Sequence, residues 1–207
     1  MTKNIIIVIK IGGAIIPKGF TEIEKENIRQ KLIKECKTQW EQFGYRKTNV
    51  DSLCSKVGIS KGSFYFFFSS KEQLFLATIK NVQDGLYSLM KDIISKEENK
   101  NGIQKALRVV YEEYDKSPFL YNTTSPDFLS FLNKISDDER NSITQDSLKS
   151  AKELFKVPFL SLRISEEKAL SVISALLFTI TSKDKMIGNH FEVFDFMLEN
   201  LINAIFE

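Results

Sequence analysis

The chain has 207 residues, of which 43% are hydrophobic and 27% are charged. This is enough apolar material for one or two globular domains, and the composition is too hydrophobic for a disordered chain. Two cysteines, Cys36 and Cys54, exclude a disulfide-rich scaffold, and with the single His190 they argue against a metal site. No apolar run reaches the roughly 18–20 residues that a membrane span needs. We therefore expect a cytoplasmic protein with no membrane association, no metal and no cofactor.

The charge is unevenly distributed along the chain. Residues 1–80 contain 14 lysines and arginines against 7 acidic residues, whereas residues 81–207 contain 15 against 20. A basic first part joined to an acidic second part indicates that the first contacts a polyanion.

Residues 1–20 differ from the rest because they contain a β-branched run, followed by Lys10-Ile11-Gly12-Gly13. A secretory signal is disfavoured because Lys10 interrupts the apolar stretch and no cleavage site of small residues follows. The stretch also resembles the opening strand of the amino-acid kinases, but that fold needs alternating strands and helices downstream, which the sequence lacks. We expect an N-terminal arm or an extension of the natural start.

Helical signals begin at Thr21, whose capping box starts a first helix that we expect to end at Gly44. A second short helix is predicted from Thr48 until Gly58 breaks it. Ser60 can cap a third helix, predicted to run through Phe68.

The rest of the chain also shows helical spacing, so we predict an all-α protein. Its further helices are expected at residues 71–95, 103–115, 126–135, 137–155, 166–182 and 190–206. The predicted organisation is an arm at 1–20, a first domain of short helices at 21–70, a connecting helix at 71–95 and a second helical domain at 96–207.

Three short helices with Gly58 between the second and third describe a helix-turn-helix, in which the third helix enters the major groove of DNA. The outward positions of this third helix carry small, hydroxylic, basic and aromatic side chains. Such residues allow close approach to base edges and phosphates. They are Ser60, Lys61, Gly62, Ser63, Tyr65 and Phe66.

Two segments resemble the DNA-binding signature of the TetR family of transcriptional regulators: TNVDSL at residues 48–53 and GISKGSFYFFFSSKEQL at 58–74. The preceding helix, with Trp40 and Gly44, matches the first helix of that family in spacing and in its ending. The resemblance is specific over about residues 22–76, and it implies a helix-turn-helix followed by a helical ligand domain.

The resemblance also implies roles for single residues. Thr48 would cap the second helix and contact a phosphate, and Ser60 would cap the recognition helix. Lys61 and Ser63 would face the DNA, while Gly62 would allow close approach of the backbone. Tyr65 and Lys71 would bind phosphates. At Phe66 and Phe67 the chain departs from the family, which usually has a histidine or tyrosine there, so we expect Phe66 to contact a sugar or a thymine methyl group.

Aromatic residues are frequent in the second half, and they can line a cavity for an apolar ligand or build an ordinary helical core. Tyrosines 111, 114 and 121 are the candidate polar groups of such a cavity. The predicted pocket residues are Tyr111, Tyr114, Phe119, Tyr121, Phe128, Phe131, Phe155, Phe159 and Phe178.

The last two predicted helices have apolar faces wider than one internal contact needs, which indicates a four-helix bundle shared by two subunits. Dimerisation through the last two helices is also what the TetR resemblance implies. The interface is predicted at Val172, Leu176, Phe194, Leu198 and Leu201.

Together these patterns predict a ligand-responsive repressor that is not an enzyme. As a homodimer it would bind a near-palindromic double-stranded DNA operator, and a small apolar effector would release it. One alternative is a DNA-binding protein without a small-molecule ligand. The other is a phosphate-binding enzyme, and only the segment Lys10–Gly13 supports this alternative.

Overall fold

The computed structural model describes residues 10–11, 14–15, 20–154 and 156–207, and most of this chain is helical. The α-helices are α1 (Glu22–Lys47), α2 (Val50–Val57), α3 (Lys61–Phe64), α4 (Lys71–Lys96), α5 (Lys100–Lys116), α6 (Pro126–Leu132), α7 (Asp137–Leu154), α8 (Glu166–Leu177) and α9 (His190–Ile205). Two 3-10 helices are η1 (Pro118–Leu120) and η2 (Phe178–Lys185). Strands β1 (Lys10–Ile11) and β2 (Ala14–Ile15) pair antiparallel. The all-α prediction is confirmed, whereas most of the predicted arm lies outside the described residues.

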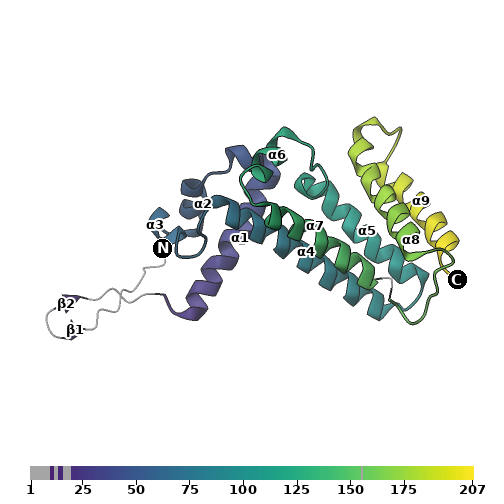
Figure 1. The fold of residues 1–207 in the computed structure, drawn as a ribbon, viewed down its shortest axis with the longest axis horizontal. Helices are drawn as coiled ribbons and strands as arrows, with labels where there is room; N and C mark the ends of the chain where they lie inside the picture. Colours follow the sequence, from purple (N-terminus) through teal and green to yellow (C-terminus); the bar gives the residue numbers. More distant parts are fainter. Residues whose placement is uncertain (1–9, 12–13, 16–19, 155) are drawn as a thin grey trace.

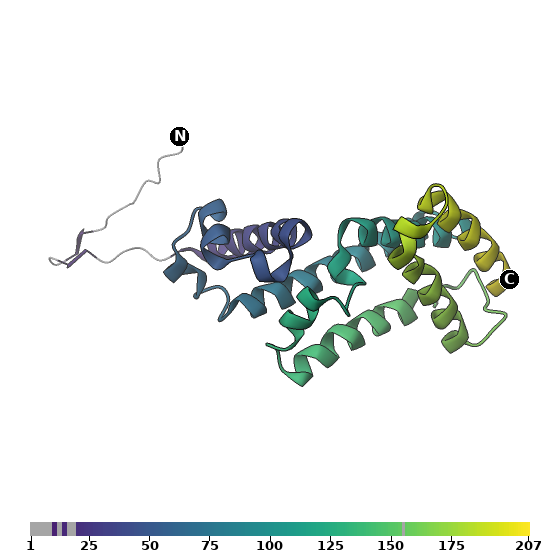
Figure 2. The same ribbon diagram turned by 90° about the horizontal axis from the view of Figure 1, so that it is seen from above.

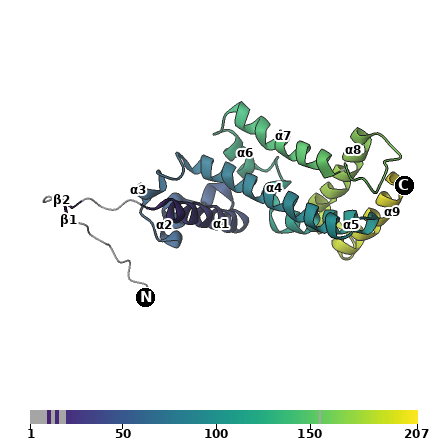
Figure 3. The ribbon, with the colours of Figure 1, turned by 90° about the horizontal axis from the view of Figure 1, so that it is seen from below.

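The helices form an elongated molecule with α1–α3 at one end and α8–α9 at the other (Figure 1). Figure 2 shows the same separation from above. Helix α4 belongs to both parts, because it packs against α1 in the first and against α5 and α7 in the second. Figure 3 shows α7 running alongside α4. Helix α4 therefore contributes buried residues to both hydrophobic cores.

Two of the three side-chain caps predicted from the sequence are confirmed. Thr21 makes the capping box with Glu24, and Ser60 Oγ accepts a hydrogen bond from the Ser63 N–H at 3.0 Å. The predicted cap of the second helix is wrong: Asn49, not Thr48, caps α2, and its Oδ1 accepts from the Ser52 N–H at 2.7 Å.

Two helix ends also differ from the prediction. At Gly44, φ is 80° and ψ is 171°, which breaks α1, but one further turn follows before the helix ends at Lys47. Helix α3 ends at Phe64 rather than Phe68, and Phe66 and Phe67 continue as a tight turn whose N–H groups donate to Ser63 and Phe64. Their side chains therefore diverge instead of following one helical face.

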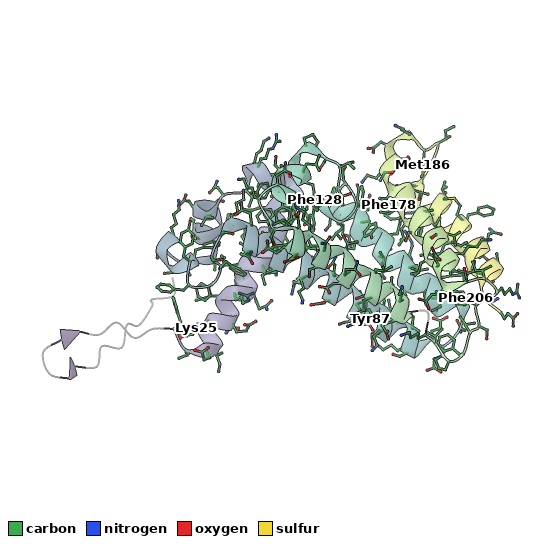
Figure 4. All side chains as sticks on the ribbon, in the orientation of Figure 1. Lys25, Tyr87, Phe128, Phe178, Met186 and Phe206 are labelled. Carbon is green, nitrogen blue, oxygen red and sulfur yellow. The ribbon has the colours of Figure 1, made fainter. Side chains whose placement is uncertain are left out.

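The first hydrophobic core joins α1–α4 to the segment 119–135. The ring of Trp40 stacks on Phe119 at 4.2 Å between centroids and on Phe128 at 6.1 Å, and it meets the edge of Phe131. Figure 4 shows Phe128 beside the end of α1, away from α8 and α9. The prediction that Phe119, Phe128 and Phe131 line a ligand pocket is therefore wrong, because these rings fill the core of the first part.

Both cysteines are buried in this first core: Cys36 is fully buried and Cys54 is 3% exposed. Burial raises the pKa of the Cys36 thiol to about 12. A thiol with such a pKa is not ionised at neutral pH, so Cys36 acts as a small hydrophobic side chain.

The second core lies between the far part of α4 and helices α5, α8 and α9. Tyr111 stacks on Phe194 at 3.7 Å between ring centroids, and both side chains are fully buried. Leu176 and Leu198 are buried in the same cluster. The predicted interface role of Leu176, Phe194 and Leu198 is therefore wrong, because packing within one subunit already covers them.

Candidate nucleic-acid interface and ligand cavity

The turn between α2 and α3 has the geometry of a helix-turn-helix. Gly58 is in the left-handed conformation, with φ 81° and ψ 35°, and its N–H donates to the Cys54 carbonyl at 2.9 Å. Leu53 on α2 and Phe64 on α3 are fully buried in the first core, so they fix the angle between the two helices. Because the fold places α3 at one end of the molecule, its outer side can approach DNA (Figure 1).

The outer side of α3 and of the turn after it combines exposed aromatic, hydroxyl and basic groups. Phe66 is 86% exposed and Tyr65 is 52% exposed. The Lys61 ammonium pairs with the Asp51 carboxylate at 2.9 Å, and Asp51 raises the pKa of this lysine. A β carbon built on Gly62 would have 3.8 Å of clearance from its nearest neighbour, so no contact within the chain requires a glycine there. Ser60, Lys61, Gly62, Ser63, Tyr65 and Phe66 thus form one surface.

Thr48 and Lys71 do not belong to this surface. Thr48 is 1% exposed, and its hydroxyl donates to the Gly44 carbonyl at 2.8 Å. The Lys71 ammonium donates to the Tyr45 carbonyl and lies 4.0 Å from the centroid of the Tyr45 ring. Burial lowers the pKa of Lys71. The predicted phosphate contacts of both residues are therefore corrected: Thr48 stabilises the end of α1, and Lys71 connects the start of α4 to α1.

A cavity of about 420 Å³ lies between α4, α5, α7 and α8 in the second part of the molecule. Of the predicted pocket residues, Tyr114 and Phe178 line it. Figure 4 shows Tyr87, Phe178 and Phe206, which all line the cavity, in the part of the molecule that contains α4, α8 and α9. Cavities of this size hold small organic molecules in many proteins.

The other predicted pocket residues lie elsewhere. Tyr111 is enclosed in the second core, and Tyr121 and Phe159 pack against that core without lining the cavity. Phe155 lies outside the described residues. These corrections have one cause: the sequence reveals which residues are aromatic but not which helix each ring faces.

Most of the cavity wall is aliphatic and was not predicted. One helical stripe on α4 supplies Leu86, Met90 and Ile94, which are spaced four residues apart, and this spacing is visible in the sequence. Further wall residues missed by the prediction are Gln83, Tyr87, Ile103, Ala106, Leu107, Val110, Leu120, Thr144, Ser147, Leu148, Ser150, Ala151, Leu170, Ile173, Ser174, Leu177 and Phe206.

Helices α8 and α9 leave an outer face that the subunit itself does not cover. Phe196 of α9 is 70% exposed, while Ser171 and Ala175 of α8 present small exposed side chains. Of the predicted interface residues, Val172 and Leu201 are half-buried, at the border between the core and this outer face.

Within the described residues, no group of three or more histidine, cysteine, aspartate or glutamate side chains could hold a metal ion. The described helices also include none with the length and hydropathy needed to cross a membrane.

The fold and the surface define an all-α protein with an N-terminal helix-turn-helix. Residues 32–78 match the family described as bacterial regulatory proteins, tetR family. This segment, which contains the helix-turn-helix, is therefore similar to the DNA-binding part of the TetR family. The TetR-like fold predicted from the sequence is confirmed.

Curated relatives are helix-turn-helix transcriptional regulators. The regulator YuxN of Bacillus subtilis is 34% identical over 86 residues, which cover 41% of this chain and 30% of YuxN. A regulator from the lacX 3′ region of Lactococcus lactis is 23% identical over 121 residues, covering 58% of this chain and 62% of the relative. The chain spans less than two thirds of the length of the curated relatives it matches.

Solved structures share the fold over most of the chain. FadR from Bacillus subtilis, solved in complex with stearoyl-CoA, has a TM-score of 0.63 at 16% identity and covers 85% of this chain and 98% of FadR. A TetR-family regulator from Mesorhizobium loti has a TM-score of 0.60 at 15% identity, covering 87% of this chain and 95% of its own. At these identities the likeness concerns the fold alone.

Proposed function

We propose that this protein is a cytoplasmic transcriptional repressor that binds a near-palindromic operator as a homodimer and is released by a small apolar ligand. The observation that carries the proposal is the exposed surface of α3, where Lys61, Tyr65 and Phe66 extend from a helix-turn-helix fixed by buried residues. A surface phenylalanine that is 86% exposed gains by contacting an apolar group such as a thymine methyl.

DNA binding would rearrange the charges of this surface. Lys61 pairs with Asp51 in the free protein, and a phosphate can replace that carboxylate as its partner. Because both side chains of the pair are exposed, breaking it costs little. Release of counterions from the DNA then favours binding, and it makes the affinity depend on salt.

The outer face of α8 and α9 supports the homodimer. It exposes the aromatic ring of Phe196 and, on α8, the small residues Ser171 and Ala175, which allow two helices to approach closely. A twofold axis through this face would pair two helix-turn-helix units across two half-sites, about 34–36 Å apart.

The cavity supports release by a ligand because α4 connects it to the DNA-binding part. Leu86, Met90 and Ile94 of α4 line the cavity, while Leu74 and Phe75 of the same helix are fully buried in the first core. A ligand that prefers one position of α4 would change the orientation of α3. By linkage, a tenfold loss of operator affinity requires the ligand to bind the free protein tenfold more tightly than the DNA-bound protein.

The test begins with selection of an operator from random duplexes by the full-length protein. Fluorescence anisotropy then measures the affinity for this operator with and without compounds that raise the melting temperature. We expect at least one such compound to lower the operator affinity tenfold or more. Compounds that stabilise the protein but leave DNA binding unchanged would favour the alternative of a DNA-binding protein without a ligand switch. Failure to select any duplex would refute the DNA-binding function.

A further inference from the structure

The cavity wall carries a specific chemical signature. Among the described residues that line it, none is a lysine, arginine, histidine, aspartate or glutamate. We propose that the ligand of this cavity is an uncharged, mainly apolar molecule with one hydrogen-bond acceptor, which the hydroxyl of Tyr114 binds. The inference rests on the proposed function, in which this cavity holds the regulatory ligand.

The absence of wall charges excludes an ionised group inside the cavity. Moving a carboxylate or phosphate from water into apolar surroundings without a cationic partner costs far more than an apolar contact returns. The deepest part of the wall is formed by buried aliphatic residues, among them Met90, Ile103 and Ile173. An uncharged molecule avoids this penalty and gains from burial of its apolar surface.

Tyr114 is the best placed polar group of the wall. Burial raises the pKa of its hydroxyl, so this group stays protonated and keeps its donor hydrogen. Its ring lies 5.8 Å from that of Tyr121, and the described part of the chain offers the Tyr114 hydroxyl no hydrogen-bond partner. Tyr114 is half-buried and lines the cavity, so its hydroxyl can donate a hydrogen bond to a ligand carbonyl or ether oxygen.

A second polar group of the wall is already engaged. The Gln83 amide donates to the Ser147 hydroxyl at 2.6 Å, linking α4 to α7 along the wall. This bond leaves two tyrosines on the wall, of which Tyr87 lies beside the exposed Lys91, whereas burial raises the pKa of Tyr114. We therefore assign the donor role to Tyr114.

One cation lies close to the cavity but outside it. The Lys91 ammonium is 5.5 Å from the centroid of the Tyr87 ring, and Tyr87 lines the cavity. Lys91 itself is exposed and is not part of the wall, so its charge is screened by water. An acid whose head group stays in water beside Lys91 is the competing arrangement, and the experiment must distinguish it.

The size of the cavity also limits the ligand. A cavity of about 420 Å³ lies within the range of pockets that hold small organic ligands. The stearoyl-CoA named with the FadR structure is much larger and carries phosphates. The proposed ligand of this chain is therefore not an acyl-CoA.

The experiment compares four ten-carbon probes by isothermal titration calorimetry with the full-length protein: 2-decanone, decane, sodium decanoate and decanoyl-CoA. We expect 2-decanone to bind at least tenfold more tightly than decanoate and decanoyl-CoA. Tyr114→Phe should weaken 2-decanone binding about five- to tenfold and leave decane unchanged, because only the hydroxyl is removed. Decane serves as the control for the shape of the cavity.

A gain of function tests the charge argument without weakening the fold. Thr144 lines the cavity from an exposed position on α7, so Thr144→Lys adds a cation at the wall. This variant should bind decanoate at least fivefold more tightly than the wild type does, whereas Thr144→Gln should not. Lys91→Ala should leave 2-decanone binding unchanged.

Two results would overturn the inference, and they are distinguishable. Binding of decanoate or decanoyl-CoA to the wild type at least as tight as that of 2-decanone would show an anionic ligand, and loss of decanoate binding in Lys91→Ala would assign the head group. That result leaves the proposed repressor intact. Failure of all four probes to bind would remove the ligand site, and with it the proposed release by an apolar ligand.

Discussion

The carboxylate of Asp127 lies against the backbone of Gly44, so that a β carbon built on this glycine would be 2.8 Å from Asp127 Oδ2. The two oxygens of Asp127 accept hydrogen bonds from the N–H groups of Tyr45 at 2.6 Å and Arg46 at 3.0 Å. These N–H groups follow the break in α1 at Gly44. An acidic residue of α6 thus satisfies the backbone where α1 restarts, as a cap does at a helix N-terminus.

Arg46 strengthens the same junction from the other side. Its Nε donates to the Ser130 hydroxyl at 2.8 Å, and its Nη2 donates to the Pro126 carbonyl at 3.0 Å. Together with the stacking of Trp40 on Phe119, these contacts connect the DNA-binding part to the segment that follows α5. The fold therefore attaches the DNA-binding part to the second half at α6 as well as through α4.

The junction predicts opposite effects for two glycine substitutions. Gly44→Ala should destabilise the protein by about 1–3 kcal/mol, because φ 80° with ψ 171° is a glycine conformation and the new methyl group would displace Asp127. Gly85 lies inside α4 with nothing within 4 Å of an added β carbon. Gly85→Ala should therefore stabilise by about 0.5–1 kcal/mol. Urea unfolding measures both, and equal effects of the two variants would contradict this account of Gly44.

Two lysines should differ in how they affect DNA binding. Lys61→Ala should lower operator affinity and reduce the slope of log K against log salt by about 1, because one phosphate contact is lost. Lys71→Ala should lower the melting temperature but leave the slope unchanged, since its ammonium is bound to Tyr45. Anisotropy titrations at several salt concentrations test this prediction. A reduced salt slope for Lys71→Ala would show that Lys71 does contact a DNA phosphate.

Substitutions at two phenylalanines of α9 should have different effects, one on dimer assembly and the other on the stability of the subunit. Phe196 is 70% exposed, so Phe196→Glu should dissociate the proposed dimer while the subunit stays folded. Phe194 is fully buried against Tyr111, and Phe194→Ala should cost the subunit about 3–5 kcal/mol of stability. Analytical ultracentrifugation and circular dichroism distinguish the two effects. A Phe196→Glu protein that sediments as a dimer at micromolar concentration would place the interface elsewhere.

The stability of the second part should depend on pH through Asp115. The Lys183 ammonium, at 2.6 Å, holds the pKa of this carboxyl below its ordinary value of 3.8, and the His190 ring lies 3.3 Å away. A lowered folded-state pKa stabilises the protein above the unfolded value, and this contribution is lost as the pH falls through the folded value. The difference in unfolding free energy between wild type and Asp115→Asn should therefore shrink as the pH falls below 3.8. A difference that persists at pH 2 would rule out Asp115 as its source.

The sequence by itself determined the features that depend on neighbouring residues. The capping box of Thr21, the cap at Ser60 and the break at Gly58 are local hydrogen-bonding or backbone properties, and each lies where it was predicted. The apolar stripe of the first helix is equally local, because helical spacing places residues three or four apart on one face. These signals were sufficient for the all-α class and the helix-turn-helix. Thr48 failed as a local prediction because Asn49, an equally good cap, follows it directly.

Only the tertiary structure decided which surfaces meet. The spacing of Phe128 and Phe131 shows that α6 has an apolar face, but nothing local reveals that this face packs on Trp40 rather than around a ligand. For the same reason, Phe194 and Phe196 are two residues apart in one helix, yet one is in the core and the other is exposed. Periodicity gives the direction of a side chain relative to its own helix. The residues that the side chain contacts depend on which distant segment packs against that helix, and this is a property of the whole fold.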